Sequence, residues 1–273
     1  MNTNYDCTLL IAGPWHANTM KMIEKNADHF KHIIVSTWSN AAPSVNLPNV
    51  HIVHQELPKI IQTHNAQNIY YQTRSTLLGL ESVMTPLVVK TRTDEFYSNL
   101  NKFVEELDPS KLVYGNIFVR DVSYKRYHIS DHLFGGTTVK LLQTFQRLRE
   151  VLEDTSKVPY PIWTDRTPAE AKIGLLYLLN SNYEIDLLLN CPETRAFEIM
   201  KNEFKIINVE NFSPYLIRSS AAGEITSLKD FLKRDTVLNL LNIKTIEDCA
   251  PRGPILHFAD RIQFKMRKFL RTP

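Results

Sequence analysis

A short apolar segment that leads directly into charged residues most constrains the fold of this chain. Residues 87–89 read Leu-Val-Val, a run typical of a strand that is buried on both faces. Lys90, Arg92, Asp94 and Glu95 follow it. In open α/β sheets, ligands bind beyond the carboxyl ends of the strands. A carboxylate there can hold a divalent cation, and nearby cations can bind phosphate. The other interpretation is that these charges are solvated where the strand leaves the core.

Strand-like and helix-like patterns alternate along the first half of the chain. Strands are predicted at 7–12, 33–37, 50–53, 87–94, 111–119 and 127–136, and helices at 18–30, 68–84, 139–152 and 165–181. Asn18 is the expected cap of the first helix. Later segments are an edge strand at 204–211, a helix at 226–241 and a basic amphipathic helix from residue 258.

This pattern predicts an α/β fold with a mostly parallel central sheet flanked by helices and a mostly helical C-terminal part. We expect a single domain made of two halves. Residues 1–140 form the α/β half, and residues 141–273 form the mostly helical half.

Composition excludes several classes of protein. Of the 273 residues, 43% are hydrophobic and 22% are charged, and the net charge is only +3, which does not indicate a nucleic-acid-binding protein. Cys7, Cys191 and Cys249 have neither disulfide-framework nor zinc spacing. We find no signal peptide and no run long enough to span a bilayer, and therefore expect a cytoplasmic protein. The basic tail is typical of a solvated helix, with weak contact to an anionic membrane as the second interpretation.

Small and polar residues follow the first two predicted strands as well. Because parallel strands end at the same edge of a sheet, a nucleotide is expected to bind across three segments. The candidates are Ala12, Gly13, Pro14, Trp15, Ser36, Thr37, Trp38, Arg92, Thr93 and Asp94. Neither a G-x-G-x-x-G motif nor a Walker A motif is present, so a dinucleotide fold and a P-loop are not supported.

Four blocks of sequence agree, in order and spacing, with one family. They are Val-Ser-Thr-Trp at 35–38, the helical block at 68–80, Lys-Thr-Arg-Thr-Asp at 90–94, and Ile-Ser-Asp-His-Leu-Phe-Gly-Gly at 129–136. Together they resemble the WavE-type lipopolysaccharide-synthesis proteins, which belong with glycosyltransferases of the GT-A fold. The resemblance covers residues 6–180. The chain is also similar to stand-alone glycosyltransferases of large algal viruses that build capsid glycans, including a xylosyltransferase.

The resemblance implies a hexosyl- or pentosyltransferase. Its donor would be a nucleotide sugar, with UDP favoured over GDP and UDP-xylose implied by the narrower match. Its acceptor would be a glycan hydroxyl, with the donor bound by residues 1–140 and the acceptor on the side of residues 141–273. Inversion of the anomeric centre is the expected outcome, and retention is the alternative that the sequence leaves open. For a viral enzyme, the compartment would be the host cytoplasm. The sequence gives no indication of the oligomeric state.

The family's acidic Asp-x-Asp motif reads Arg92-Thr93-Asp94 here, so the first acid is missing. The resemblance places Asp94 as a ligand of Mn²⁺ or Mg²⁺, while Arg92 could itself neutralise a phosphate. His257 is a late histidine placed like one that completes the metal site in some enzymes of this fold. The family tends to have a basic residue where this chain has Tyr71, and Arg74, about one turn on, is the candidate replacement.

An inverting transfer needs a general base for the acceptor hydroxyl. Asp131 precedes a glycine pair, where a sugar could approach the backbone closely. Glu170 lies where the family places an acceptor-side acid, but Thr167-Pro168-Ala169-Glu170 also reads as a capping box. Asp165 is the third candidate.

Two other functions stay open at this point. One is a nucleotide-binding module without catalysis, in which Arg92 marks a lost metal site. The other is a metal-dependent phosphodiesterase that uses Asp94 and Glu95, although no further acids cluster near them in the sequence.

Overall fold

The computed structural model describes residues 5–38, 45–59, 68–123, 125–154, 156, 167–219, 223–226 and 243–251. A seven-stranded sheet in the order β3-β2-β1-β4-β7-β6-β8 forms its centre. The strands are β1 (Tyr5–Ala12), β2 (Phe30–Trp38), β3 (Val50–Gln55), β4 (Leu87–Arg92), β6 (Leu112–Gly115), β7 (Phe134–Thr137) and β8 (Phe204–Ile207). All neighbours are parallel except β7, which is antiparallel to β4 and β6.

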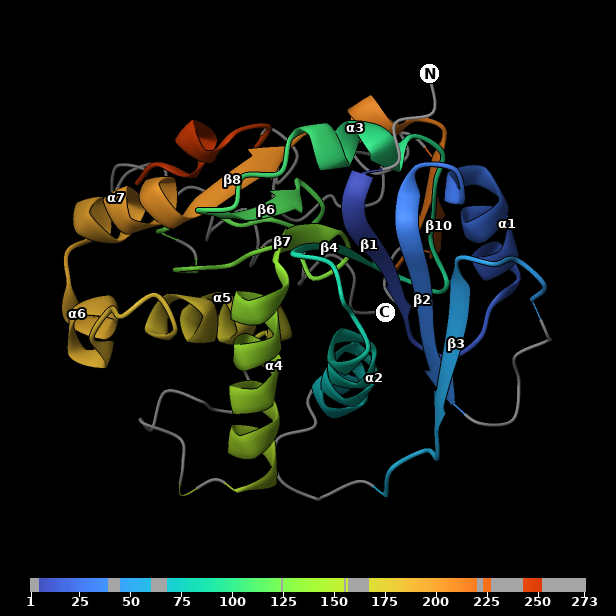
Figure 1. Cartoon of the computed structure of the whole chain (residues 1–273). Coiled ribbons are helices and arrows are strands. Elements are labelled where there is room, and N and C mark those ends of the chain that lie inside the picture. The colour runs from blue at the N-terminus through green and yellow to red at the C-terminus, as the bar shows by residue number, and fades with distance from the viewer. Residues whose placement is uncertain are drawn as a thin grey trace, which may run out of the picture.

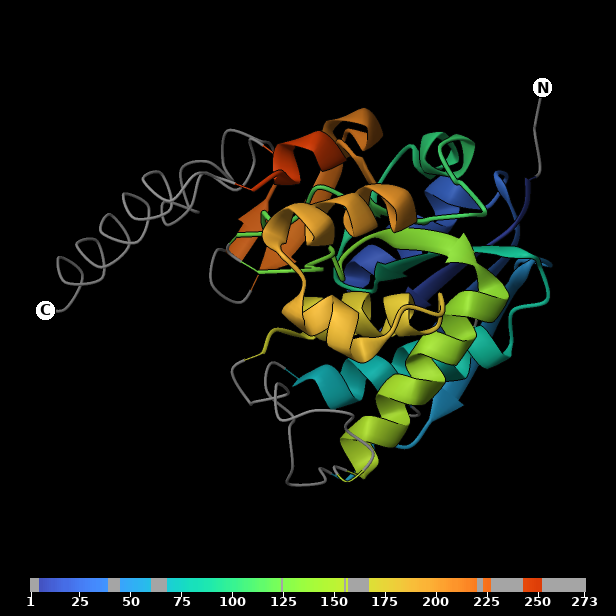
Figure 2. The same cartoon turned by 90° about the vertical axis from the view of Figure 1, so that its left-hand side faces the viewer.

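Helices cover both faces of this sheet, which gives three layers (Figure 1). The α-helices are α1 (Ala17–Asn26), α2 (Ile69–Glu81), α3 (Leu100–Glu105), α4 (Thr138–Glu153), α5 (Ala169–Leu179), α6 (Ile185–Asn190) and α7 (Glu193–Glu203). One apolar core lies between the sheet and α2, α4, α5 and α7, and the other lies between the sheet and α1 and α3. Viewed from the side, α4 crosses beneath the sheet next to α5 (Figure 2).

The predicted α/β fold with a mostly parallel sheet is confirmed, and the sheet is compatible with a GT-A-like arrangement. The predicted edge strand at 204–211 is confirmed as β8, which is shorter and lies at the edge of the sheet. The predicted strand at 127–136 is wrong over most of its length, since only Phe134–Thr137 forms β7. Two features of its first part do not fit a strand. The carbonyl of Asp131 accepts a hydrogen bond from the Lys90 ammonium at 2.6 Å, and Tyr127 has a left-handed backbone with a φ of 56°.

A close approach explains the glycine inside α2. A Cβ built on Gly79 would lie 2.2 Å from Leu10 Cδ1 of β1 and 3.1 Å from Ser36 Cβ of β2. Helix α2 therefore packs directly on the two strands whose ends carry the candidate nucleotide residues. The fixed position of α2 brings its polar face to the carboxyl edge of the sheet.

A second sheet in the C-terminal part was not predicted. It joins β5 (Phe96–Tyr97) to β9 (Tyr215–Ser219), which pairs in turn with β10 (Gly223–Ile225). The pairing of β5 with β9 connects residues far apart in the chain. Short 3₁₀ helices lie at η3 (Val209–Phe212) and η5 (Ile246–Cys249). The predicted helix at 226–241, apart from residue 226, lies outside the described residues. The predicted helix from residue 258 lies outside them as well. Within the described part of the chain, no helix is both long and apolar enough to cross a bilayer.

Candidate functional site

Three parallel strands end at one edge of the sheet and open into a cleft there. Ala12 at the end of β1 pairs in register with Ser36 of β2 on one side and with Arg92 of β4 on the other. The cleft at this edge has a volume of about 1150 Å³. It is lined by Ala12, Gly13, Pro14, Trp15, His16, Trp38, Leu57, Asn68, Tyr71, Gln72, Ser75, Lys90, Arg92, Thr93, Asp94, Phe118, Arg120, His128, Asp131, His132, Pro168, Ala169 and Glu170.

Most of the candidate nucleotide residues line this cleft, with three exceptions. Ser36 and Thr37 are fully buried and do not line it, since Ser36 faces α2. Arg74 also lies outside the cleft lining, because its guanidinium pairs with Glu153 of α4 at 3.2 Å. Ser36 and Thr37 were expected to line the cleft because they occupy a strand end, but they point to opposite faces of the sheet and both are fully buried there.

An aromatic pair lies at the wall formed by β2 and α2. The rings of Trp38 and Tyr71 meet edge to face, with centroids 6.1 Å apart. Tyr71 occupies the position where the resembled family tends to have a basic residue. An aromatic wall can stack against a flat, neutral ring system.

The start of α1 is tied to the end of β4. Asn18 Nδ2 donates to the carbonyl of Asp94 at 3.0 Å, and Thr19 Oγ1 donates to the carbonyl of Thr93 at 3.1 Å. The predicted cap at Asn18 is wrong, because His16 is the N-cap and its Nδ1 accepts from the Asn18 amide at 3.1 Å. Asn18 instead holds the backbone of the strand end, which keeps the charged segment after β4 in place.

Arg92 and Asp94 form a two-pronged ion pair at the cleft. The guanidinium donates from Nε and Nη2 to the two carboxylate oxygens of Asp94, both at 3.0 Å. Burial acts to raise the pKa of Asp94, but the hydrogen bonds and charge of Arg92 outweigh it, and the pKa is lowered. Asp94 is therefore ionised and already engaged by a cation.

These residues do not form a metal site by themselves. Both oxygens of Asp94 accept hydrogen bonds from Arg92, and its neighbour Glu95 is fully buried. In the described ranges, no three His, Cys, Asp or Glu side chains gather into a set that could hold a metal ion. The predicted ligand His257 lies outside those ranges. The Mn²⁺ or Mg²⁺ at Asp94 stays a prediction.

A buried chain of ionisable groups links the end of β4 to the far side of the cleft. Glu95 accepts from the Tyr97 hydroxyl at 2.8 Å and bonds His132 Nδ1. His132 Nε2 lies 3.6 Å from Asp131 Oδ1. Burial acts to lower the pKa of His132, but the charges of Glu95 and Asp131 outweigh it and raise the pKa. An imidazolium between two carboxylates is the form that this geometry favours.

Asp131 is held from two further sides. Gln72 Nε2 of α2 donates to its Oδ2 at 2.8 Å, and the Lys90 ammonium donates to its backbone carbonyl. Burial acts to raise the pKa of Asp131, but His132, Lys90 and Arg92 outweigh it and lower the pKa. Lys90 is itself 1% exposed, and burial lowers its pKa to about 8.

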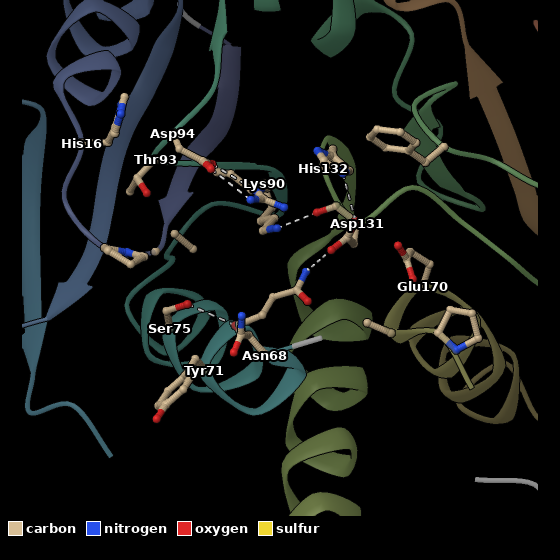
Figure 3. Close-up of a pocket in the computed structure, with 18 of the residues that line it drawn as sticks. His16, Asn68, Tyr71, Ser75, Lys90, Thr93, Asp94, Asp131, His132 and Glu170 are labelled. Atoms are coloured by element: carbon tan, nitrogen blue, oxygen red, sulfur yellow. Dashed lines mark hydrogen bonds and ion pairs between the residues drawn. The ribbon is translucent and has the colours of Figure 1, made fainter. Parts of the chain in front are cut away.

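Glu170 shares this side of the cleft and has the opposite charge preference. In Figure 3 the side chains of Asp131, His132 and Glu170 lie on one side, and those of His16, Thr93 and Asp94 lie across from them. Burial, followed by the charge of Asp131, raises the pKa of Glu170 to about 7. Its Oε2 lies 4.0 Å from His128 Nε2. Burial, with Arg120 next in effect, lowers the pKa of His128 to about 3, so this imidazole is neutral at pH 7.

The capping-box interpretation of Glu170 is wrong. Helix α5 begins at Ala169 with Pro168 as its N-cap, and no side chain makes a capping hydrogen bond. Glu170 therefore has no capping role and lies in the cleft lining. Helix α5 lies close to the segment that carries His128, since a Cβ on Gly174 would lie 1.9 Å from the Tyr127 carbonyl oxygen.

Asp165, the third candidate base, lies outside the described residues.

Several residues that line the cleft were not among the candidates from the sequence. The sequence could have placed Lys90 in the cleft, because Lys90, Arg92 and Asp94 are spaced two residues apart along one strand and its extension. Side chains at that spacing lie on the same face. The link from Glu95 to His132 joins residues 37 positions apart, and no spacing rule reveals it. Gln72 had no signal beyond its place in a helix.

In comparisons with known proteins, neither a family model nor a curated sequence matches this chain.

Proposed function

We propose that the protein is a glycosyltransferase that moves a sugar from a nucleoside-diphosphate donor to a hydroxyl group of a glycan acceptor. One observation carries the proposal. The cleft at the strand ends combines Arg92 and Lys90 with an Asp131 that is ionised and a Glu170 whose pKa is about 7. Two carboxyl groups whose environments separate their pKa values are typical of sites that do acid–base chemistry.

In this proposal the donor lies along the ends of β1, β2 and β4. The nucleobase, uracil before guanine, lies against Trp38 and Tyr71, and the segment from Ala12 to Trp15 contacts the nucleoside. Arg92 faces the diphosphate, since a guanidinium binds phosphate oxygens in the same two-pronged manner as the carboxylate of Asp94.

Glu170 is the proposed general base. Its carboxylate takes the proton of the acceptor hydroxyl while the hydroxyl oxygen forms a bond to the anomeric carbon. The bond from that carbon to the diphosphate breaks, and the diphosphate leaves with the electron pair. A base with a pKa near 7 is half ionised at neutral pH and remains basic enough to accept the proton. Attack from the face opposite the leaving group would invert the anomeric centre.

Charge on the leaving diphosphate is met in this proposal by the guanidinium groups of Arg92 and Arg120, which both line the cleft. Since Asp94 is engaged by Arg92, we derive no step through a metal ion. The metal implied by the family resemblance is tested by comparing transfer in Mn²⁺, in Mg²⁺ and in EDTA. Equal rates assign the diphosphate to Arg92, and a loss in EDTA restores the metal role.

A nucleotide-binding module without catalysis is the second candidate function. The arginine in place of the first acid, bonded to Asp94, favours it. The phosphodiesterase is disfavoured, because Glu95 is fully buried and bonded to Tyr97 and His132, so it cannot join Asp94 in a metal site.

The proposed function is tested by binding and turnover together. Thermal shift and calorimetry with UDP, GDP and their sugar conjugates give binding, and release of the free nucleoside diphosphate with a glycan acceptor mixture gives turnover. A ligand at 100 times its dissociation constant should add about 2.7 kcal/mol of stability. Arg92→Ala should weaken binding of the nucleoside diphosphate, whereas Lys31→Ala, an exposed lysine paired with Asp6, should not. Binding without any turnover supports the non-catalytic module. No binding of either nucleotide series contradicts both.

A further inference from the structure

Asp131 has hydrogen-bonding capacity that the described residues do not fill. Its Oδ2 accepts from Gln72, but its Oδ1 is buried and accepts no hydrogen bond, although the His132 ring lies 3.6 Å away. The residue is only 7% exposed and lines the cleft. A buried carboxylate oxygen without a donor is costly, which points to a donor supplied by a ligand.

Two further polar atoms on this side of the cleft are also buried without a hydrogen-bond partner in the described part of the chain. His128 Nδ1 and Glu170 Oε2 are buried and have no hydrogen-bond partner among the described residues. Both residues line the cleft, and His128 is 4% exposed. The three unsatisfied atoms therefore belong to two loop residues and a residue in the first turn of α5, and all three residues line the cavity.

The charges at this place define what can bind. Ionised Asp131 can only accept hydrogen bonds, so its partner must be a donor. Lys90 and His132 already offset its charge, so a cationic partner is not required. An anionic partner group would lie beside the negative charge of Asp131 and the partial negative charge of Glu170, and this repulsion between like charges is unfavourable. A neutral hydroxyl group satisfies all of these conditions.

We propose that Asp131, oriented by Gln72 and His132, is a subsite for a hydroxyl group of the donor sugar and selects neutral sugars over uronic acids. This inference rests on the proposed function and adds the class of sugar. Glu95 is then a positioning residue, since it holds the His132 ring against Asp131.

UDP, UDP-xylose, UDP-glucose and UDP-glucuronic acid form a matched set of probes. The three sugars share their ring and differ only in whether C5 carries hydrogen, a hydroxymethyl group or a carboxylate. In the wild-type protein we expect UDP-xylose and UDP-glucose to bind at least about 10-fold tighter than UDP, because a hydrogen bond to a charged group is worth that much. UDP-glucuronic acid should bind more weakly than UDP-glucose.

Asp131→Asn keeps the shape of the side chain and removes its charge. It should erase the gain of the neutral sugars over UDP and narrow the gap between UDP-glucose and UDP-glucuronic acid, while UDP itself binds as before. Glu203→Gln is the matched control, because Glu203 is partly buried, bonded to Lys140 and not part of the cleft lining. A merely structural role for Asp131 would weaken all four probes together.

The failures of the two proposals differ. If UDP binds through Arg92 but the sugars add nothing, or if Asp131→Asn leaves the neutral-to-uronate ratio unchanged, the subsite is overturned and the proposed function stands. If neither UDP nor GDP binds, the proposed function fails. Should Asp131→Asn not fold, Gln72→Met removes a donor to Asp131 and should lower the same ratio, and an unchanged ratio there also overturns the subsite.

Discussion

The opposite charge preferences of Asp131 and Glu170 arise from their surroundings. Asp131 has the His132 imidazolium and the Lys90 ammonium within contact, so its carboxylate is favoured despite burial. Glu170 is buried beside that negative charge and a neutral His128, so its carboxyl group stays protonated up to about pH 7. Asp131, with the lowered pKa, is therefore the fixed anion, and Glu170, with the raised pKa, is the residue that can exchange a proton.

Glu170→Gln should lower turnover by about 10²–10⁴-fold with donor binding retained, because the base is lost and the nucleotide contacts are not. Wild-type turnover should rise with pH through a midpoint near 7, where the carboxylate forms, and the residual turnover of the variant should lack that rise. Turnover measured from pH 5 to 9 checks both statements. Full activity of Glu170→Gln would remove it as the base and leave Asp131 and Asp165 as candidates.

Lys90 acts on the cleft through the backbone. Its ammonium holds the Asp131 carbonyl and lies 5.1 Å from the centre of the Phe134 ring. Lys90→Met keeps the apolar stem and leaves that carbonyl without its donor, which should cost about 1–3 kcal/mol of stability. It should also weaken neutral-sugar donors more than UDP, because Asp131 loses its anchor. Chemical denaturation and calorimetry measure the two effects, and equal weakening of all ligands would assign Lys90 to the diphosphate.

Among the elements, the sequence predicted those whose signal is local. The apolar run of β4 and the periodicity of α2 determine both elements, and the parallel order of β1, β2 and β4 places their ends together. The segment before β7 was predicted as strand because it is partly apolar and β-branched. In the structure the carbonyl of Asp131 in this segment accepts a hydrogen bond from Lys90, which lies 41 positions earlier in the chain. The pairing of β5 with β9 is equally non-local, and each partner is too short to be recognised alone.

The residues of the candidate site also divide into those that local sequence patterns predict and those that depend on non-local contacts. Residues at strand ends could be predicted because the topology alone brings them together, and most of them line the cleft. Ser36 and Thr37 could not be told from their neighbours without knowing which face α2 covers. The roles of Glu95 and His132 depend on burial and on a contact across the molecule, which periodicity and spacing do not encode.

Two helical glycines give a test of how tightly these elements must pack. Gly174→Ala would place a methyl group 1.9 Å from the rigid Tyr127 carbonyl oxygen, so α5 must shift, with a cost of about 1–3 kcal/mol and a displacement of Glu170. Gly79→Ala meets the flexible end of Leu10, and alanine gains about 1 kcal/mol of helix propensity, so its net loss should be smaller. Unfolding in denaturant compares the pair, and Gly174→Ala should also lose turnover. A larger loss for Gly79→Ala would contradict this packing.

At the scale of the whole molecule, the cleft lies where the sheet, α2, the segment around His128 and the start of α5 meet (Figure 3). Function and folding stability are therefore linked through the same buried ionisable groups. His128 and Glu170 both change their protonation on unfolding, and they act in opposite directions.

The sign of each contribution follows from the number of protons bound. His128 has a pKa of about 3 when folded and about 6.5, the ordinary value of an imidazole, when unfolded. The unfolded chain therefore binds more protons between these values, and stability rises with pH there. Glu170 has a pKa of about 7 when folded and 4.5 when unfolded, so the folded chain binds more protons, and stability falls as pH rises from 4.5 to 7. Since one pKa unit corresponds to about 1.4 kcal/mol, each contribution is on the order of 3–5 kcal/mol.

His128→Gln and Glu170→Gln should separate the two effects. Relative to wild type, His128→Gln should lose less stability between pH 6.5 and pH 4, because its unfolded chain has no imidazole at this position to take up a proton. Glu170→Gln should gain stability relative to wild type as the pH rises from 4.5 to 7, because its unfolded chain has no carboxyl group at this position to release a proton. Denaturant unfolding at half-unit steps of pH measures both. If the Glu170→Gln curve runs parallel to wild type, Glu170 titrates normally in the folded protein, and its assignment as a base poised near neutral pH is wrong.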